Sequence, residues 1–320
     1  MNELIQKIYQ IGIVPVVVFT DIKQVLPAAR ALLEGGIDCA EITFRTNTAE
    51  EAIKIISNEL PQMLVGAGTV LTTDQVDKAQ KAGAKFIVSP GTNPKILKHC
   101  VDKNITVIAG CSNPSDIEIC LEYGIDTVKF FPAEAAGGIN MVKAMSAPYT
   151  NVKFMPTGGI DIKNLNSYLS FNKVIACGGS WMINKNLLEK EDYQTVKQLS
   201  KEAVSTMLGF EFKHMGINST DVSETEKTAQ IFSNLFDFAK RQTSVSIFTA
   251  DYLEIMKPPW RGSKGHIAIA ANNVDRAVYY LSKKSVKFDE DSAKYDIEKK
   301  LTSIYLEGEI GGFAIHLCKK

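Results

Sequence analysis

The sequence predicts an α/β protein in which a (β/α)8 TIM barrel over residues 1–208 is followed by a small α+β domain over residues 209–320. In the barrel region, eight apolar runs alternate with helical stretches. Successive runs start about 20 to 26 residues apart, and each gap fits one crossover helix, as parallel strands require. An internal repeat in the remaining chain predicts two βαβββ modules.

The eight runs are rich in Val, Ile and Phe, and each ends in or near a Gly, Pro, Thr or Ser. Near-continuous apolar runs are typical of strands buried on both faces. Eight β/α units in about 200 residues favour a compact barrel over an open sheet. A helix over Asn2–Ile11 is expected to close the bottom of the barrel, and Asp192–Met207 is expected to be its last helix. The expected strands are Ile13–Phe19, Ile37–Phe44, Met63–Val70, Lys85–Gly91, Thr106–Cys111, Asp126–Pro132, Val152–Gly159 and Lys173–Ser180.

The repeat in the C-terminal region has two copies with matching landmarks. The first copy begins at His214 and reaches Asp221-Val222, and the second begins at His266 and reaches Asn273-Val274 at the same offsets. In each copy we expect a strand, an Asx N-cap and a helix, followed by further strands. The last strands are expected at Tyr252–Met256 and Phe313–Cys318.

Composition indicates the compartment and the partners. The chain has 36 basic and 36 acidic residues, so its balance of charge gives no reason to expect nucleic acid or an anionic membrane as a partner. The N-terminus has no basic region before its apolar run, so we expect no signal peptide and no transmembrane helix. Six cysteines without a Cys-x-x-Cys pair are interpreted as buried free thiols. A cytoplasmic protein is therefore expected.

Lys129 lies in the sixth apolar run, near the end where barrel enzymes place their active sites. A buried amine favours its neutral form, which is able to attack a carbonyl carbon. The alternative is a structural lysine that reaches water or a carboxylate. Phe131 shares the face of Lys129, because alternate residues of a strand point the same way.

The second run places Glu41, Thr43 and Arg45 on one face of a strand. A guanidinium group grips a carboxylate with two hydrogen bonds, and a glutamate beside an amine can move protons. These residues suggest a site that binds a carboxylate and moves protons beside the amine. The alternative is a structural Glu–Arg ion pair.

Two glycine pairs end the seventh and eighth runs, at Gly158-Gly159 and Gly178-Gly179-Ser180. Glycines expose backbone N–H groups, and a helix that begins after them adds its dipole. Barrels often hold phosphate at this place, so the two pairs together predict a phosphate site. Each pair alone is also consistent with a tight turn.

These motifs closely resemble those of the 2-keto-3-deoxy-6-phosphogluconate / 4-hydroxy-2-oxoglutarate (KDPG/KHG) aldolase family, over about residues 1–208. The matching segments are Glu41-Ile-Thr-Phe-Arg-Thr, Val65-Gly-Ala-Gly-Thr-Val, Ser89-Pro-Gly, Val128-Lys-Phe-Phe-Pro-Ala-Glu, Pro156-Thr-Gly-Gly and Gly178-Gly-Ser-Trp. The resemblance implies a class I aldolase that forms a Schiff base with pyruvate, uses no metal or other cofactor in the barrel, and assembles as a homotrimer.

The resemblance also implies a role for each matching residue. Lys129 is implied to form the Schiff base, and Glu41 to act as general acid and base. The residues implied to bind the small keto-acid substrate are Arg45 and Thr69 at its carboxylate, Pro90 and Phe131 as pocket walls, and Gly158, Gly159, Gly179 and Ser180 at its phosphate.

The C-terminal repeat resembles the vicinal-oxygen-chelate superfamily, which includes glyoxalase I. That superfamily places metal ligands at four matching positions, here His214, Glu254, His266 and His316. The last position more often carries Glu. A divalent metal such as Zn, Ni, Mn or Fe(II) suits these donors. The alternative is a domain kept for assembly or for binding.

Three functions are consistent with these patterns. The first is the aldolase, which the resemblance implies to cleave 2-keto-3-deoxy-6-phosphogluconate to pyruvate and glyceraldehyde 3-phosphate, 4-hydroxy-2-oxoglutarate to pyruvate and glyoxylate, or both. The galactonate epimer of the first substrate is an alternative. The second is a phosphosugar isomerase or decarboxylase on the same barrel. The third is a non-catalytic ligand-binding protein that acts through its C-terminal domain.

Overall fold

The computed structural model describes residues 2–257 and 259–320. The chain divides into two compact units, Met1–Met207 and Leu208–Lys320. We describe each unit by itself.

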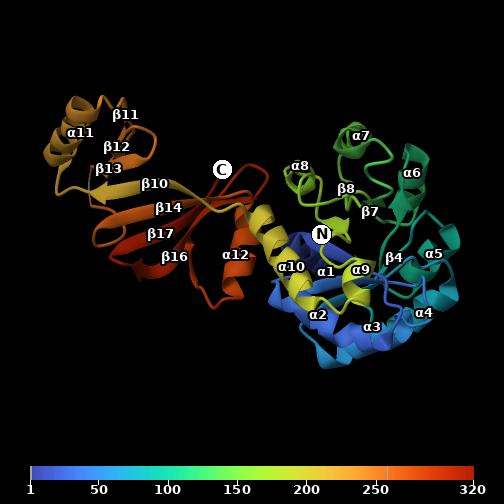
Figure 1. Cartoon of the computed structure of the whole chain (residues 1–320). Helices are drawn as coiled ribbons and strands as arrows, with labels where there is room; N and C mark the ends of the chain where they lie inside the picture. The colour runs from blue at the N-terminus through green and yellow to red at the C-terminus, as the bar shows by residue number, and fades with distance from the viewer. Residues whose placement is uncertain (1, 258) are drawn as a thin grey trace. The chain divides into compact units, whose positions relative to one another are not determined.

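The first unit alternates short strands with helices along the chain (Figure 1). Its strands are β1 (Ile13–Val17), β2 (Cys39–Thr43), β3 (Leu64–Gly68), β4 (Phe86–Val88), β5 (Thr106–Ile108), β6 (Gly110–Cys111), β7 (Thr127–Phe130), β8 (Lys153–Phe154) and β9 (Cys177–Gly179). Its helices are α1 (Glu3–Ile11), η1 (Ile22–Gln24), α2 (Val25–Glu34), α3 (Ala49–Glu59), α4 (Thr73–Ala82), α5 (Pro94–Asp102), α6 (Pro114–Glu122), α7 (Gly138–Ser146), α8 (Leu165–Leu169), α9 (Lys185–Glu189) and α10 (Tyr193–Leu208).

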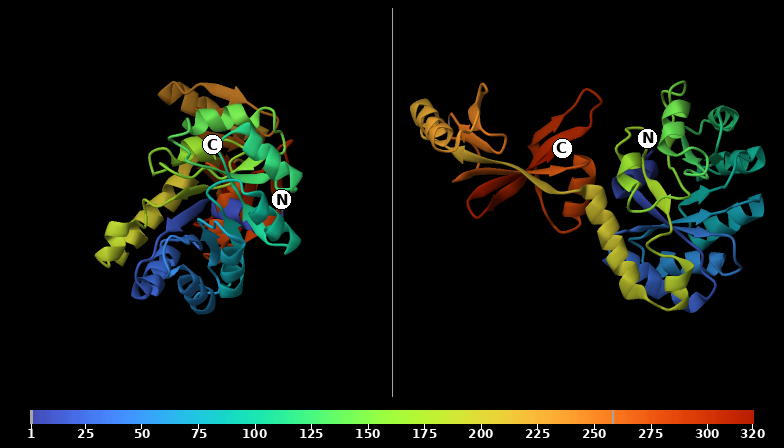
Figure 2. Two further views of the ribbon diagram at one scale, coloured as in Figure 1. Left: turned by 90° about the vertical axis from the view of Figure 1, so that its right-hand side faces the viewer. Right: turned by 45° about the horizontal axis from the view of Figure 1, so that its top comes forward.

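The strands of the first unit form a curled parallel sheet of the barrel type. One set pairs in the order β5-β4-β3-β2-β1-β9 and the other in the order β6-β7-β8. Isolated parallel bridges, Phe154 to Val174 and Thr157 to Gly178, lie between the β8 and β9 regions. Helices α2 to α6 surround the strands from outside (Figures 1 and 2). Parallel strands with helical crossovers bury both faces, which explains their apolar sequences.

The fifth expected strand differs from the prediction. The run Thr106–Cys111 is divided at Ala109 into β5, which pairs with β4, and β6, which pairs with β7. The strands in the seventh and eighth expected runs, β8 and β9, are also shorter than those runs. The division lets one segment turn from one neighbour to the other where the sheet curls.

Both terminal helices of the first unit are confirmed, and local caps explain their ends. The side chain of Asn2 accepts a hydrogen bond from the Ile5 backbone N–H, and Gly12 ends α1 with a φ of 74°. This left-handed conformation costs glycine little. Asp192 accepts a hydrogen bond from the Thr195 N–H at 3.0 Å, as an N-cap does at the start of α10.

The second unit is one mixed sheet with two helices. Its elements are β10 (Glu211–Asn218), α11 (Val222–Phe236), β11 (Lys240–Gln242), β12 (Ser246–Thr249), β13 (Leu253–Met256), β14 (Gly265–Ala271), α12 (Val274–Ser282), β15 (Phe288–Tyr295), β16 (Leu301–Ile310) and β17 (Phe313–Lys319). The strand order is β11-β12-β13-β10-β14-β17-β16-β15. At its centre, β10 pairs antiparallel with β14, while β10 and β13, and β14 and β17, pair in parallel.

Helix caps in the second unit fall where the repeat predicts them. Asp221 caps α11 and Asn273 caps α12, each by accepting a hydrogen bond from a backbone N–H three residues later. Helix α11 packs on β12 and β13, and α12 packs on β16 and β17. A small core of Ala229, Ile247 and Ile255 lies under α11. Because Ile255 follows Glu254 in β13, Glu254 points to the opposite face of the sheet.

Cysteine chemistry agrees with the expectation from the sequence. All six cysteines are free thiols, and five of them are buried.

Within residues 2–257 and 259–320, none of the helices combines the length and the apolar character needed to cross a bilayer.

Candidate functional sites

Lys129 and Glu41 form a buried ion pair inside the first unit. Lys129 Nζ donates to Glu41 Oε1 at 3.1 Å and approaches Oε2 at 3.4 Å. Glu41 is fully buried, and Lys129 is 5% exposed. A charge buried without a partner is costly, so each residue makes the burial of the other tolerable. The amine and a proton-accepting carboxylate therefore lie in direct contact, which the sequence predicts only as a shared face of the barrel.

Two glycines of β3 leave space for neighbouring side chains, and one of them, Gly68, lies against the ion pair. A Cβ atom on Gly68 would lie 2.2 Å from Glu41 Oε1, and one on Gly66 would lie 2.3 Å from the Phe86 ring. Neither glycine has the positive φ that strains other residues. Their role is therefore to leave volume for a neighbour, and at Gly68 that neighbour is the carboxylate of the ion pair.

Phe131 and the loop of Pro90 lie near Lys129. The Phe131 ring centroid is 5.3 Å from Lys129 Nζ. Lys129 pairs with Gly110 on β6, and a Cβ atom on Gly110 would lie 2.1 Å from the Pro90 carbonyl oxygen. The loop that carries Pro90 therefore rests against the strand next to the lysine.

Arg45 and Thr69 meet just beyond the ends of β2 and β3. Arg45 Nε donates to Thr69 Oγ1 at 3.3 Å, and Arg45 is exposed. Thr69 has a φ of 54°, an uncommon value for a residue with a Cβ atom. Thr43 does not join them, because its hydroxyl donates to the Val17 carbonyl oxygen at 3.1 Å. The guanidinium and the Thr69 hydroxyl are thus held together at the rim.

The two glycine loops lie side by side. The bridge between Thr157 and Gly178 joins the β8 and β9 regions, and Gly158 and Gly159 have φ values of 101° and 78°. Gly159 and Ser180 are exposed. A Cβ atom on Gly179 would lie 2.0 Å from the Trp181 ring, so packing alone requires glycine there.

Among the described residues, neither glycine pair leads directly into a helix. Helix α8 starts at Leu165 and α9 at Lys185, and each has only five residues. Loop residues intervene, and Asp161 and Asn164 form a turn there, with the Asp161 N–H donating to Asn164 Oδ1 at 2.9 Å. Any anion at these loops would be held by loop N–H groups and the Ser180 hydroxyl rather than by a helix dipole.

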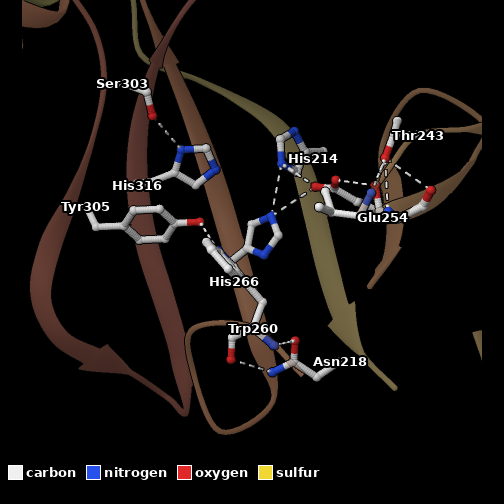
Figure 3. Close-up of polar contacts among 11 residues, drawn as sticks. His214, Asn218, Thr243, Glu254, Trp260, His266, Ser303, Tyr305 and His316 are labelled. Carbon is white, nitrogen blue, oxygen red and sulfur yellow. Dashed lines mark hydrogen bonds and ion pairs between the residues drawn. The ribbon is translucent and has the colours of Figure 1, made fainter. Parts of the chain in front are cut away.

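In the second unit, four side chains converge on one face of the sheet (Figure 3). We call His214, Glu254, His266 and His316 the His214 cluster. His214 Nε2 lies 3.1 Å from His266 Nε2, and Glu254 Oε2 lies 3.3 Å and 3.2 Å from these two atoms. A ligand atom from each of the three histidines lies within 4.8 Å of the others. Nitrogen and oxygen donors of this kind suit divalent transition metals.

Strand register brings the His214 cluster together. Gly216 of β10 pairs with both Glu254 and His266, and Ala268 of β14 pairs with both His214 and His316. Directly paired residues point to the same face. Small residues therefore alternate with those of the His214 cluster, and a Cβ atom on Gly216 would lie 2.0 Å from the His266 ring.

Polar neighbours orient part of the His214 cluster and leave other atoms open. Ser246 donates to Glu254 Oε1 at 2.6 Å, and Ser303 Oγ lies 3.3 Å from His316 Nδ1. In the described part of the chain, His266 Nδ1 and His316 Nε2 are buried with no hydrogen-bond partner. A buried polar atom without a partner is unusual and calls for an explanation.

The surroundings also shift two pKa values. Burial raises the pKa of Glu254, but hydrogen bonds with His214, His266 and Ser246 outweigh that effect and hold the pKa well below its usual range. Burial and the neighbouring His266 and His214 lower the pKa of His316 to about 4. At neutral pH, the cluster therefore offers an ionised carboxylate and a neutral imidazole, which are the forms that bind metals.

Sequence reasoning missed several residues around these sites. Gly68 and Gly216 make space for a functional side chain, and Trp260, Tyr305 and Lys294 line a cavity over the His214 cluster. Strand alternation would have placed Gly216 on the ligand face. No local signal identifies the other residues, because loops and distant strands bring them in.

Comparison with known proteins gives a family match in the first unit. The KDPG and KHG aldolase family model matches residues 4–199. The 2-dehydro-3-deoxy-phosphogluconate aldolase of Treponema pallidum is 45% identical over 204 residues, which are 64% of this chain and 97% of the relative. The Haemophilus influenzae protein of the same name is 44% identical over 203 residues, covering 63% and 96% of the two chains.

A solved structure of an aldolase is also similar to the first unit. The KDPG aldolase of Legionella pneumophila, with pyruvate captured at low pH as a covalent carbinolamine intermediate, is 36% identical with a TM-score of 0.61. It covers 63% of this chain and 98% of its own.

Proposed function

This chain belongs to the KDPG and KHG aldolase family, and we propose that its first unit is a class I aldolase. The substrates are 2-keto-3-deoxy-6-phosphogluconate, which yields pyruvate and glyceraldehyde 3-phosphate, and 4-hydroxy-2-oxoglutarate, which yields pyruvate and glyoxylate. The contact of Lys129 Nζ with Glu41 Oε1 at 3.1 Å, inside the curled sheet, is the observation that carries this proposal. The named relatives support the substrate class.

The reaction begins with proton transfer inside the ion pair. Glu41 accepts a proton from the Lys129 ammonium, which leaves a neutral amine beside a carboxylic acid. The amine nitrogen attacks C2 of the keto acid to form a carbinolamine. Glu41 returns the proton to the carbinolamine hydroxyl, which leaves as water, and a protonated imine remains on Lys129.

Carbon–carbon cleavage follows from the charge on the imine. A base removes the C4 hydroxyl proton, and Glu41, again a carboxylate, is placed to do this directly or through a water. The C3–C4 electron pair moves toward the iminium nitrogen, so an aldehyde leaves and an enamine remains. Protonation at C3 and hydrolysis then release pyruvate and restore the amine.

Binding groups surround the reacting atoms. Arg45, held by Thr69, is proposed to grip the substrate carboxylate. Pro90 and Phe131 form walls beside the imine. The loops of Gly158, Gly159, Gly179 and Ser180 are proposed to hold the phosphate through their N–H groups and the serine hydroxyl.

We also propose that the curled sheet closes as a (β/α)8 barrel within residues 1–208. The parallel pairings and the two bridges support this closure.

We further propose a cytoplasmic location and a homotrimer. The six free thiols support the location. The family resemblance supports the homotrimer, and light scattering on the purified protein measures its mass directly.

Trapping of the imine tests the aldolase. The protein is incubated with pyruvate and borohydride, and its intact mass is measured. We expect a permanent pyruvate adduct in the wild type and in Lys153→Met, which changes a lysine on the neighbouring strand β8. We expect none in Lys129→Met. A folded wild-type protein without an adduct would refute the class I aldolase.

Product analysis separates the remaining alternatives. Pyruvate released from the gluconate-derived substrate, but not from the galactonate epimer, fixes the stereochemistry. A phosphosugar isomerase or decarboxylase would turn over its own substrate without an imine. A pure ligand-binding protein would show neither activity.

We further propose that the second unit, residues 209–320, is a vicinal-oxygen-chelate domain with a divalent metal on the His214 cluster. The order β10-α11-β11-β12-β13 followed by β14-α12-β15-β16-β17 supports two βαβββ modules. The cluster takes one ligand from each of β10, β13, β14 and β17, so both modules contribute.

The residues present fit a metal. Tetrahedral ligands at about 2.0–2.2 Å from zinc lie about 3.3–3.6 Å apart. His214 Nε2, His266 Nε2 and Glu254 Oε2 are separated by 3.1–3.3 Å. His316 Nε2, buried without a partner in the described residues, gains one in a metal. Ser303 and Ser246 would orient two ligands from behind. A metal here would supply a Lewis acid for a bound oxygen.

Metal analysis tests this second site. Protein stripped with a chelator is reloaded with zinc or cobalt, and bound metal is measured per chain. We expect one metal in the wild type and in His99→Ala, whose histidine contacts Asp77 in the first unit. We expect loss of binding in His266→Ala. Equal binding by the wild type and His266→Ala would refute the site.

A further inference from the structure

A cavity of about 260 Å³ lies directly over the His214 cluster. The four ligating side chains form one part of its lining, and Val245, Met256, Trp260, Tyr305 and Lys294 form the rest. The Tyr305 ring stacks on His316 with centroids 4.7 Å apart (Figure 3). A ligand in this cavity would touch the proposed metal and the aromatic wall together.

Fixed contacts hold the aromatic wall in place. Trp260 Nε1 donates to the Tyr305 hydroxyl at 3.3 Å. Asn218 anchors the Trp260 loop, because it accepts from the Trp260 N–H at 2.9 Å and donates to the Trp260 carbonyl oxygen at 3.2 Å (Figure 3). Arg261 stacks over Tyr305 at 4.8 Å and pairs with Asp289. The wall is therefore built before any ligand arrives.

Two donors of this cavity have no acceptor among the residues that the structure describes. The Tyr305 hydroxyl accepts a hydrogen bond from Trp260, and its own hydrogen has no acceptor among the described residues. Lys294 is exposed and lines the cavity, and its ammonium has neither an ion pair nor a hydrogen bond among the described residues, whereas Arg261, which lies over the Tyr305 ring, is paired with Asp289. An unpaired lysine and a hydroxyl that can still donate, both from residues that line one cavity, suit the two oxygens of a carboxylate.

Charge favours an anion at the same place. A divalent metal on three neutral histidines and one Glu254 carboxylate would carry a net charge of +1, and Lys294 adds another positive charge. Glu254 is the only acidic residue among those that line the cavity. Its carboxylate already contacts His214, His266 and Ser246, so it does not neutralise Lys294.

Size and wall chemistry narrow the class of anion. A water occupies about 30 Å³ in the liquid, so the cavity holds the space of about eight or nine waters. Drug-sized ligands need more room. Apolar and aromatic walls suit a short carbon chain, which a free phosphate ion lacks. We infer that this cavity binds a small aliphatic carboxylate, with its carboxyl group held by Lys294 and Tyr305 next to the metal.

This inference rests on the proposed metal site, and the experiment separates the two. The full chain carrying Lys129→Met is used, so that pyruvate forms no imine in the first unit. It is loaded with Co(II), whose visible spectrum reports changes at the metal. Pyruvate is titrated as the probe, with its neutral amide and inorganic phosphate as comparisons.

We expect pyruvate to change the cobalt spectrum with saturation, and the amide and phosphate to have little effect. Lys294→Met should weaken pyruvate binding about tenfold or more, as the loss of a charge-assisted hydrogen bond predicts, without changing cobalt affinity. Lys287→Met, an exposed lysine just before β15, is the matched control and should bind pyruvate like the parent.

Each contrary result has a separate meaning. Absence of cobalt binding refutes the metal site, and the carboxylate inference with it, and leaves the aldolase untouched. Cobalt binding without a response to pyruvate refutes the carboxylate alone. An equal response to the amide or to phosphate, or equal binding by Lys294→Met, also refutes it.

Discussion

The carboxylate of Glu41 occupies the space that a side chain on Gly68 would need. A Cβ atom there would lie 2.2 Å from Oε1, 2.5 Å from Cγ and 2.7 Å from Cδ of Glu41. Since Glu41 is fully buried and bonded to Lys129, it has little room to move. The position of the proton-transfer group thus depends on a missing methyl group on the next strand.

Gly68→Ala is therefore expected to displace the Glu41 carboxylate. A shift of about 1 Å in a catalytic group lowers the rate by about 100-fold, and overpacking costs about 1–3 kcal/mol of stability. Rates of pyruvate release and urea unfolding curves measure the two effects.

Gly66→Ala provides the matched comparison. Its Cβ atom meets the Phe86 ring at 2.3 Å and does not meet Glu41. Both variants should lose similar stability, but the folded Gly66→Ala protein should keep most of its kcat. Equal losses of kcat would show that Gly68 acts only through packing.

Glu41→Gln keeps the shape of the side chain and removes its ability to take a proton. General acid–base catalysis contributes about 10²–10⁴-fold, so kcat should fall within that range while the borohydride adduct on Lys129 still forms slowly. Glu50→Gln, an exposed residue in the first turn of α3, serves as the control. A Glu41→Gln enzyme with normal kcat would remove Glu41 from the mechanism.

Gly216→Ala should weaken metal binding in the second unit. The added Cβ atom lies 2.0 Å from the His266 ring, so the imidazole must turn away from Glu254 and His214. Changes that misorient a metal ligand typically lower affinity about 10–100-fold. Competition with a chromophoric chelator gives the dissociation constant. Met215→Leu changes the next residue, on the opposite face, and should leave the affinity unchanged.

The metal-free protein is expected to lose stability as the pH falls from about 6.5 toward about 4. His316 has a pKa of about 4 in the folded chain against an ordinary value of 6.5. Between these values, the unfolded chain binds a proton that the folded chain does not, so acid favours unfolding. The lowered pKa of Glu254 adds a further loss below its ordinary value of 4.5.

Thermal unfolding of the chelator-treated protein at several pH values measures this loss. His316→Phe should flatten the dependence between pH 6.5 and 4. An unchanged slope in that variant would contradict the assignment to His316.

The sequence alone predicts much of the first unit. Buried parallel strands are nearly continuous apolar runs, so their order along the chain is visible in the pattern, and Lys129 and Glu41 stand out as charges inside such runs. The break at Ala109 is not visible, because both halves of the run are equally apolar. The late start of α8 follows a turn at Asp161 and Asn164, and α9 begins after its own cap at Asn184, neither of which the glycine pairs reveal.

The second unit is predictable only in part. The repeat and its Asx caps are local signals, and the structure confirms the caps at Asp221 and Asn273. The cavity over the His214 cluster has no local signal, because its lining residues are far apart in the sequence. Tyr305 comes from β16 and Trp260 from a loop, and only the register of β16 on β17 and the Asn218 contacts bring them together.

The antiparallel pairing of β10 with β14 has a consequence for synthesis on the ribosome. Until β14 emerges, β10 is an open strand edge, and such edges recruit other chains. Ala271 follows Met256, the end of β13, by about 15 residues, which take about 1–3 s to translate. During that interval, the nascent first module is open to pairing with neighbours on the same messenger RNA, and continued elongation ends the exposure.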